Sequence, residues 1–377
     1  MNERIPTYER GLTHPDGPAG GWPLVFRALI RPASLLVVAS AAALTWPSTA
    51  AAQAAGSPEA QAAARTDPSW QPPRTPWGHP DLQGIWTTDD MRGIPQQRAP
   101  EFGTRQHLTD EEYAQREEQR ERARQTQDRG ASGTFRNEEG TRSFSYTSLV
   151  IDPPDGRIPP VLAAARERPM TPGSFGLGPF NSVADFSLYD RCITRGVIGS
   201  FSPAVYGNGA RIVQTPDTVA ISYEMVHDTR IIPLDGRPAL SPSIRQYMGD
   251  ARGRFEGNTL VIETTNFTDK LAIGGVRHSE QLRLTERFTR IDPEMIDYEI
   301  RVEDPMTWEQ PWTLRMTITQ QPGYEIYEYS CHEGNIAIRH ALLGERAYEK
   351  AAAEAAAKGL PPPERVFERV NGPDRAR

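Results

Sequence analysis

Residues 296–303 read Ile296-Asp297-Tyr298-Glu299-Ile300-Arg301-Val302-Glu303, and this alternation decides the fold class. Apolar side chains occupy every second position, and charged side chains fill the positions between them. Because successive side chains of a β-strand point to opposite faces, this strand has one buried face and one solvated face. That pattern is typical of an antiparallel sheet with a single buried side.

The same period of two recurs on both sides of this strand. The apolar positions that share a parity are Leu282, Leu284 and Phe288, then Trp312, Leu314, Met316 and Ile318, and earlier Val219, Ile221, Tyr223 and Met225. Within 250–265, Glu256-Gly257-Asn258 separates two strand-like runs and indicates a hairpin. We therefore predict a mainly β protein, an antiparallel meander that forms a lipocalin-like barrel with helical excursions and a C-terminal helix.

Two helices are predicted outside the meander. Thr109 and Glu112 form a capping box at the start of a highly charged helix that runs to about Gln127. Residues 344–358 are rich in alanine and glutamate and end at Gly359, a residue favoured after a helix C-terminus. The first helix, charged all round, is predicted to be solvated.

The N-terminal region has the pattern of an export signal. Arg27 and Arg31 precede an apolar run at 35–44, and Ala50-Ala51-Ala52 supplies a small-residue cleavage site. We assign 1–52 to an N-terminal extension and signal peptide and 53–80 to a flexible leader. A β-barrel-like domain over 81–340 carries a loop and helix insert at about 90–195, and 341–377 form the C-terminal helix and tail.

The export signal, the net charge and the cysteines limit the cellular locations and the classes of partner that we expect. The signal predicts a periplasmic or secreted protein, and no membrane span is expected once it is removed. A formal net charge of −7 argues against nucleic-acid binding. The chain has two cysteines, Cys192 and Cys331, and an oxidising compartment favours a disulfide between them. No cofactor motif is found: a phosphate-binding glycine loop, a dinucleotide fingerprint and a nucleophile elbow are all missing from the sequence.

Several motifs resemble those of uncharacterised exported proteins of Acidobacteria and Proteobacteria. They comprise Pro76-Trp77-Gly78 with 81–86 (DLQGIW), 152–160 (DPPDGRIPP), 227–238 (HDTRIIPLDGRP), 249–260 (GDARGRFEGNTL) and 327–335 (YEYSCHEGN). The resemblance covers nearly the whole mature chain and implies export, but no reaction. Gly84-Ile85-Trp86 also resembles the G-x-W of the first lipocalin strand, which implies a barrel that holds a small ligand. The insert at 90–195 departs from a simple lipocalin.

The segment 327–335 holds the first candidate catalytic group. In a straight strand Glu328 and His332 would lie about 13 Å apart, too far for a hydrogen bond. A turn at Cys331-His332 would bring Glu328 or Glu333 to His332, which would then act as a general acid or base. The alternative is that these residues end a strand and hydrogen-bond to the chain near the disulfide.

His227 is the second candidate, because His227-Asp228 stands between two strand-like runs like a hairpin tip. It is either a turn residue or a catalytic residue at a barrel mouth. A metal site built from His227, His278 and His332 is a weaker alternative, because no metal-binding spacing of histidines occurs.

Arginines supply the candidate substrate-binding residues. Arg230, Arg252 and Arg254, together with Asp250 and Tyr327, are assigned to a site that holds a carboxylate or another anion. The alternative is structural pairing of the buried arginines with Asp250, Glu256 or Glu286.

Three functions follow from these observations. The first is a periplasmic enzyme, of hydrolase or lyase type, that acts on a small organic molecule in a barrel pocket by metal-free His/Glu acid–base chemistry. The second is a non-catalytic, lipocalin-type binding protein for a small ligand. The third is an envelope-associated structural protein with a filled interior.

Overall fold

The computed structural model describes residues 69–126, 140–168 and 179–364. The chain divides into a unit of residues 1–54 and a unit of residues 55–377, and every described residue belongs to the second unit. The predicted signal peptide and most of the predicted leader lie outside the described residues.

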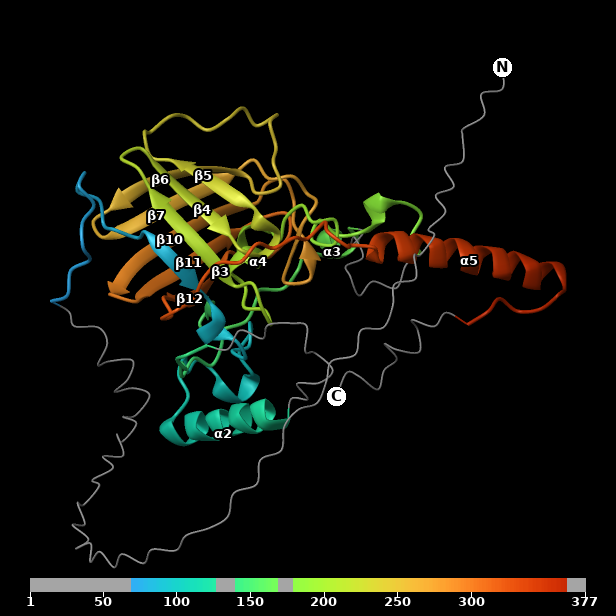
Figure 1. Ribbon diagram of the computed structural model, residues 1–377, viewed down its shortest axis with the longest axis horizontal. Coiled ribbons are helices and arrows are strands. Elements are labelled where there is room, and N and C mark those ends of the chain that lie inside the picture. Colours follow the sequence, from blue (N-terminus) through green and yellow to red (C-terminus); the bar gives the residue numbers. More distant parts are fainter. Residues whose placement is uncertain (1–68, 127–139, 169–178, 365–377) are drawn as a thin grey trace, which may run out of the picture. The chain divides into compact units, whose positions relative to one another are not determined.

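A single antiparallel sheet dominates the described part of the chain and confirms the mainly β fold (Figure 1). Ten strands form it, in the order β5-β4-β3-β1-β12-β11-β10-β7-β6, with β2 pairing with β12. Their bounds are β1 Gly84–Thr87, β2 Val150–Asp152, β3 Gly209–Gln214, β4 Thr218–Tyr223, β5 Thr229–Pro233, β6 Asp250–Glu256, β7 Thr259–Thr265, β10 Arg283–Asp292, β11 Met295–Glu303 and β12 Trp312–Thr319. A separate hairpin joins β8 Ala272–Ile273 to β9 Val276–Arg277.

The alternation read from the sequence matches the buried face of this sheet. Tyr298 and Ile300 of β11 are fully buried and lie opposite Phe288 and Glu286 of β10. The predicted hairpin at Gly257 joins β6 to β7, and Gly257 has a φ of 61°, a left-handed conformation that suits glycine. Strand parity therefore placed the core faces correctly.

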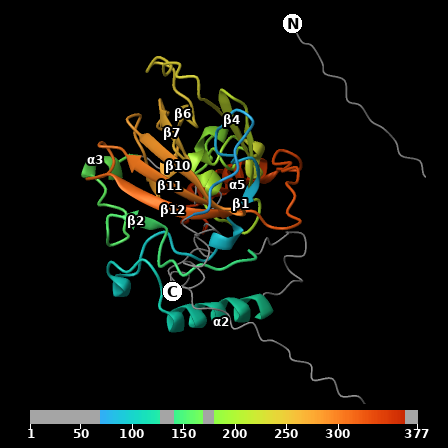
Figure 2. The same cartoon turned by 90° about the vertical axis from the view of Figure 1, so that its left-hand side faces the viewer.

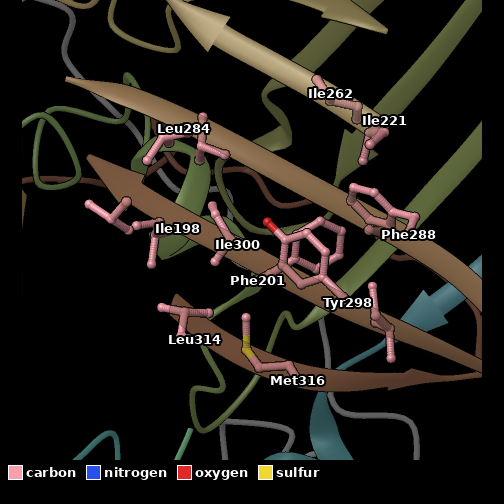
Figure 3. Packing of buried hydrophobic residues seen from close by; sticks show 14 of the residues in the cluster. Ile198, Phe201, Ile221, Ile262, Leu284, Phe288, Tyr298, Ile300, Leu314 and Met316 are labelled. Atoms are coloured by element: carbon pink, nitrogen blue, oxygen red, sulfur yellow. The ribbon is translucent and has the colours of Figure 1, made fainter. Parts of the chain in front are cut away.

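Helix α4, Gly196–Phe201, packs against the buried face of the sheet. The Phe201 ring lies 5.1 Å from the ring of Tyr223 in β4 and 5.0 Å from that of Tyr298 in β11. Figure 3 shows Ile198 and Phe201 among side chains from β10, β11 and β12. Since β4 and β11 are distant in the strand order, the sheet curls around α4, which fills its interior with apolar side chains.

The two edge strands of the sheet, β5 and β6, lie beside each other without a hydrogen-bonded ladder in the described residues. Eight successive antiparallel pairings separate them, so they run in the same direction. Side chains occupy the space between them: a Cβ at Gly253 would lie 2.7 Å from Leu234 Cδ2 and 2.8 Å from Ile232 Cγ2. These contacts keep the strands together where a closed barrel would have backbone hydrogen bonds.

The remaining helices lie outside the sheet (Figures 1 and 2). They are α2 Asp110–Thr126, α3 Ala163–Arg166 and α5 Ala337–Ala357, with short 3₁₀ turns at Asp89–Met91, Pro100–Phe102, Val183–Asp185 and Met225–His227. The capping box at α2 is confirmed, since the Thr109 backbone N–H donates to Glu112 Oε2 at 2.8 Å and the Glu112 N–H to Thr109 Oγ1 at 3.3 Å. Among the helices that the structure describes, none combines the length and apolar character that crossing a membrane requires.

The C-terminal region differs from the expectation in two ways. Helix α5 begins seven residues before the predicted start at Gly344, although it ends as expected just before Gly359, whose φ is 67°. The strand considered for 327–335 is not formed: the chain there is irregular and then turns at 331–334. A disulfide and side-chain hydrogen bonds hold this stretch instead of a ladder.

Candidate functional site

A cleft of about 760 Å³ opens beside β5 and the start of β6. Four parts of the chain form its walls. They are β5, the start of β6 with the residues before it, the residues before α4, and the residues after β7. The lining residues are Ile193, Thr194, Asp228, Thr229, Arg230, Ile231, Arg245, Gln246, Tyr247, Met248, Gly249, Asp250, Ala251, Thr268 and Lys270. This volume is in the range of clefts that bind small organic molecules.

Arg230 is the most deeply buried charge in the wall of the cleft. Its guanidinium donates to both oxygens of Glu286, at 2.9 and 2.6 Å, and to Thr264 Oγ1 at 3.1 Å. The Tyr298 hydroxyl donates to Glu286 Oε1 at 2.9 Å. Arg230 is 4% exposed and Glu286 0% exposed, so this is a buried, bidentate ion pair, and the residues that form and hold it come from four strands, β5, β7, β10 and β11.

Electrostatics fix the charge state of this pair. Burial opposes the charge on Arg230, but the attraction of Glu286 outweighs it and raises the Arg230 pKa above its ordinary value. Burial raises the pKa of the neighbouring Tyr223 hydroxyl to about 12. The cluster therefore keeps a charged guanidinium between neutral phenols at neutral pH.

Two polar atoms of cleft residues have no hydrogen-bond partner. They are Arg230 Nε and Thr268 Oγ1, and both are buried. Buried polar groups are almost always satisfied in folded proteins, so each of these atoms calls for an explanation. Both belong to residues that line the cleft, but neither atom is itself exposed to it.

The other charges of the cleft are closer to solvent. Arg245 lies 3.1 Å from Glu280, and Lys270 lies 3.1 Å from Asp269, both with exposed carboxylates. Such pairs contribute little to stability and exchange partners readily. Asp228 accepts from the neighbouring Thr229 N–H at 2.9 Å and belongs to none of the ion pairs found among the described residues. The rim therefore offers both signs of charge to a ligand.

The predicted substrate-binding residues separate into two groups. Arg230 and Asp250 line the cleft, whereas Arg252, Arg254 and Tyr327 are not among its lining residues. Arg252 binds Asp250 at 2.5 Å and also donates to the Pro238 carbonyl, while Arg254 binds Glu256 at 2.8 Å. Arg230 in turn binds Glu286. All three carboxylates named in the pairing alternative, Asp250, Glu256 and Glu286, are thus paired with these arginines.

The predicted catalytic residues belong to a different region. His332, Glu333 and Glu328 are exposed, lie in the irregular stretch before α5, and do not line the cleft. His227 also lies outside the lining; its Nδ1 is 3.0 Å from the Tyr329 carbonyl oxygen, to which a protonated Nδ1 donates. The acid–base role of these four residues stays a prediction.

His227 sits in a strained turn. Val226 and His227 have φ values of 69° and 47°, a left-handed conformation that side chains rarely adopt. The turn connects β4 to β5, as expected from the sequence, and it contacts the stretch of residues 320–336, which we call the C-terminal segment. Strain at this position is retained because the C-terminal segment binds the turn and the sheet holds both of its ends.

The disulfide predicted from the cysteine count is present. Cys192 and Cys331 are bonded, with Cα atoms 5.7 Å apart, and the bond joins the chain before α4 to the C-terminal segment. Glu224 adds to this attachment, because it accepts from the Tyr324 hydroxyl at 2.7 Å and from the Tyr327 N–H at 3.3 Å. Tyr327 therefore contributes its backbone to the fold rather than a side chain to the cleft.

Sequence reasoning missed Glu224 and Thr268, whereas it named Glu286 as a possible partner of a buried arginine. The signal for Glu286 was visible, since it occupies a parity position between Leu284 and Phe288, where a charge points into the core. No comparable signal marks Thr268, whose position depends on how the chain folds back after β7.

Metal binding has no support from the side-chain arrangement. Among the residues that the structure describes, no group of three or more His, Cys, Asp or Glu side chains is placed to hold a metal ion. His227, His278 and His332 thus do not form the metal site considered from the sequence. His278 is buried, with Nδ1 3.0 Å from the Ser279 carbonyl oxygen, while the other two are exposed.

Comparison with known proteins adds no relative: no family model matches the chain, and neither a curated protein nor a solved structure is similar to it.

Proposed function

We propose that the protein binds a small organic molecule in the cleft between β5 and β6, without converting it. The observation that carries this proposal is the cleft of about 760 Å³, which is lined by apolar side chains together with the charged residues Asp228, Arg245 and Lys270. A carboxylate on the ligand would be attracted by Arg245 and Lys270, whose ion pairs at the rim are close to solvent. The apolar lining of Ile193, Tyr247 and Met248 suits the hydrocarbon part of such a ligand.

Binding is favoured over acid–base catalysis because the predicted catalytic residues do not line the cleft. A general acid or base must come within hydrogen-bond reach of the reacting group. His332 and Glu333 are instead exposed in the C-terminal segment. The helix-filled interior of the sheet also favours this cleft as the ligand site.

The proposal includes a lipocalin-like, incompletely closed barrel and an exported location. The contact between the edge strands β5 and β6 and the curl of the sheet around Phe201 support the barrel. The disulfide supports an oxidising compartment, such as the periplasm or the extracellular space. The family resemblance of the motifs remains part of this proposal.

Equilibrium dialysis of the purified protein against an extract of the host's metabolites, followed by mass spectrometry, tests the function. Thr268→Trp places a large side chain in the cleft, and Thr285→Trp places the same side chain on β10, away from it. We expect compounds retained by the wild type and by Thr285→Trp to be lost from Thr268→Trp.

Two results would overturn the proposal. Equal retention by both tryptophan variants would place the ligand elsewhere. Consumption of a compound by the wild type but not by His332→Ala would show an enzyme and support the acid–base prediction instead.

A further inference from the structure

Strand β5 is an edge of the sheet, and its outer side borders the cleft. The consecutive residues 228–231 line the cleft and span about 10 Å in an extended strand, the length of a peptide segment of three or four residues. Among the described strands β4 is the one hydrogen-bonded neighbour of β5. The other side of β5 therefore carries backbone groups that no described strand binds, a state that natural proteins usually cover or block.

The direction of these backbone groups follows from the hydrogen bonds at the two ends of the β4–β5 pairing. The Leu234 N–H donates to the Asp217 carbonyl at 2.8 Å. The Tyr223 N–H donates to the Asp228 carbonyl at 3.0 Å. Because hydrogen-bonded positions alternate in an antiparallel ladder, the even-numbered residues of β5 bond to β4 and the odd-numbered residues face away. Ile231 therefore directs both its N–H and its carbonyl toward the cleft that it lines.

The neighbouring edge strand, β6, is less available to a ligand. Arg252 Nη1 donates to the Ala251 carbonyl at 2.6 Å and so occupies an acceptor at the start of β6. Farther along the two strands are in contact, since a Cβ at Gly253 would lie 2.8 Å from Ile232 Cγ2. Pro233, which has no N–H, ends the run of donors on β5. The open stretch of edge is thus the first part of β5, where the cleft lies.

The side chains around this stretch suit an apolar segment that carries a carboxylate. Ile231 is 60% exposed, more than any other large apolar side chain in the described part of the chain, and the exposed Tyr247 lines the same cleft. In a paired strand the residue opposite Ile231 places its side chain beside that of Ile231, on the same face. Arg245 and Lys270 at the rim attract a carboxylate.

We propose that the ligand of the cleft is a short, extended peptide that carries a carboxylate and pairs with β5 as an added strand. This inference rests on the proposed function, because it names the class of molecule that the cleft binds. The peptide accepts a hydrogen bond from the Ile231 N–H, donates one to the Ile231 carbonyl and places an apolar side chain beside Ile231. Main-chain hydrogen bonds supply affinity in this mode of recognition, and the side-chain positions supply selectivity.

A pool of synthetic pentapeptides, with four random residues and a C-terminal glutamate, serves as the probe. Mass spectrometry identifies the peptides that the protein retains in equilibrium dialysis. The wild type and Ile231→Val should retain the same peptides, enriched in β-branched and aromatic residues. Ile231→Pro removes the N–H at a position where an edge strand tolerates proline, so retention should fall about fivefold or more.

Backbone methylation of one retained peptide tests for a strand. The peptide is resynthesised with a single N-methyl group at each amide in turn. Because the N–H groups of a strand alternate in direction, methylation of those that face β5 should weaken binding about three- to tenfold, and methylation of those between them should change it little. In the wild type, hydrogen exchange of the Ile231 amide should slow when the peptide is added, while exchange of the Tyr298 amide in β11 stays the same.

The results that would overturn the inference differ from those that would overturn the proposed function. Equal effects of methylation at successive amides, or unchanged exchange at Ile231, would show that the peptide does not pair with β5. Retention of no peptide, together with a non-peptide metabolite that Thr268→Trp loses, would overturn the inference and leave the cleft as the ligand site. Absence of every ligand would overturn both. If Ile231→Pro fails to fold, the methylation series decides, since it uses the wild-type protein.

Discussion

Glu286 occupies an inward position of β10, where the strand pattern otherwise places leucine and phenylalanine. Its ion pair with Arg230 ties β10 to the edge strand β5 across the interior of the sheet. A buried ion pair adds little net stability, because desolvation offsets the attraction. Removing only one partner is strongly destabilising, because the remaining charge is then buried without a counter-ion.

Glu286→Gln should therefore lower the free energy of unfolding by about 3–5 kcal/mol. Replacing both partners, as in Arg230→Met with Glu286→Leu, should restore most of this loss. Urea denaturation of the wild type, both single variants and the double variant measures the coupling. Additive losses in the double variant would contradict a buried pair.

His278 makes stability depend on pH. Burial lowers its pKa below the ordinary value of 6.5, so the folded protein holds the ring neutral. The unfolded chain binds a proton first as the pH falls through about 6.5, which favours unfolding. The stability that depends on neutral His278 is thus complete above this pH and is lost as the pH falls toward the folded pKa.

The measurement is the free energy of unfolding between about pH 7.5 and pH 5. The wild type should lose stability more steeply than His278→Gln, in which no imidazole titrates at this position. Parallel curves for the two proteins would show that His278 is accessible to protons in the folded state.

Helix α4 fills the interior around which the sheet curls. Phe201, fully buried, contacts the rings of Tyr223, Phe288 and Tyr298. Phe201→Ala should cost about 3–5 kcal/mol, since it removes a ring that packs between β4 and the paired strands β10 and β11. Phe255→Ala, at the half-buried end of β6, should cost clearly less. Thermal or urea unfolding of the two variants gives the comparison.

Regular elements were predictable from the sequence because their signals are local. Parity located β11 and β12, a capping box located α2, and Gly257 located a hairpin. The start of α5 was missed because 337–343 lacks a capping signal: its N-cap position, Ile336, makes no side-chain cap hydrogen bond. Local signals thus fix where many elements lie, and tertiary contacts fix the rest.

The candidate site was less predictable, since it depends on contacts between distant residues. No local pattern indicates that Thr268 and Arg230 line the same cleft, or that the hydroxyls of Tyr329 and Tyr189 lie 3.4 Å apart. Arg230 was assigned to anion binding, with pairing to Glu286 as the alternative, and the curl of the sheet is what brings the two side chains together. Residue types therefore suggested the chemistry, and the topology decided which of them meet.

At the scale of the molecule, the disulfide fastens the C-terminal segment to the sheet. Most side chains of 320–336 are exposed, so few apolar contacts hold this segment. Closing a loop of sequence separation 139 contributes about 5 kcal/mol by the chain-entropy model. The segment should therefore be released before the sheet unfolds when the bond is removed.

The Cys192→Ser, Cys331→Ser double variant tests this expectation by hydrogen exchange. Amides of 324–336 should lose protection, while those of β10 and β11 keep it. Uniform loss of protection would mean that the disulfide stabilises the whole fold cooperatively.

The short strand β1 lies in the middle of the sheet, between β3 and β12, although it comes first in the described chain. It meets β12 at one residue pair, Thr87 with Thr319, which are 232 positions apart. During synthesis β1 leaves the ribosome early, whereas its neighbour β12 is made much later. Such non-local pairing is slow to form. The nascent chain therefore carries an incomplete sheet with open edges until almost all of it has been made, and in that interval it depends on being kept from other chains.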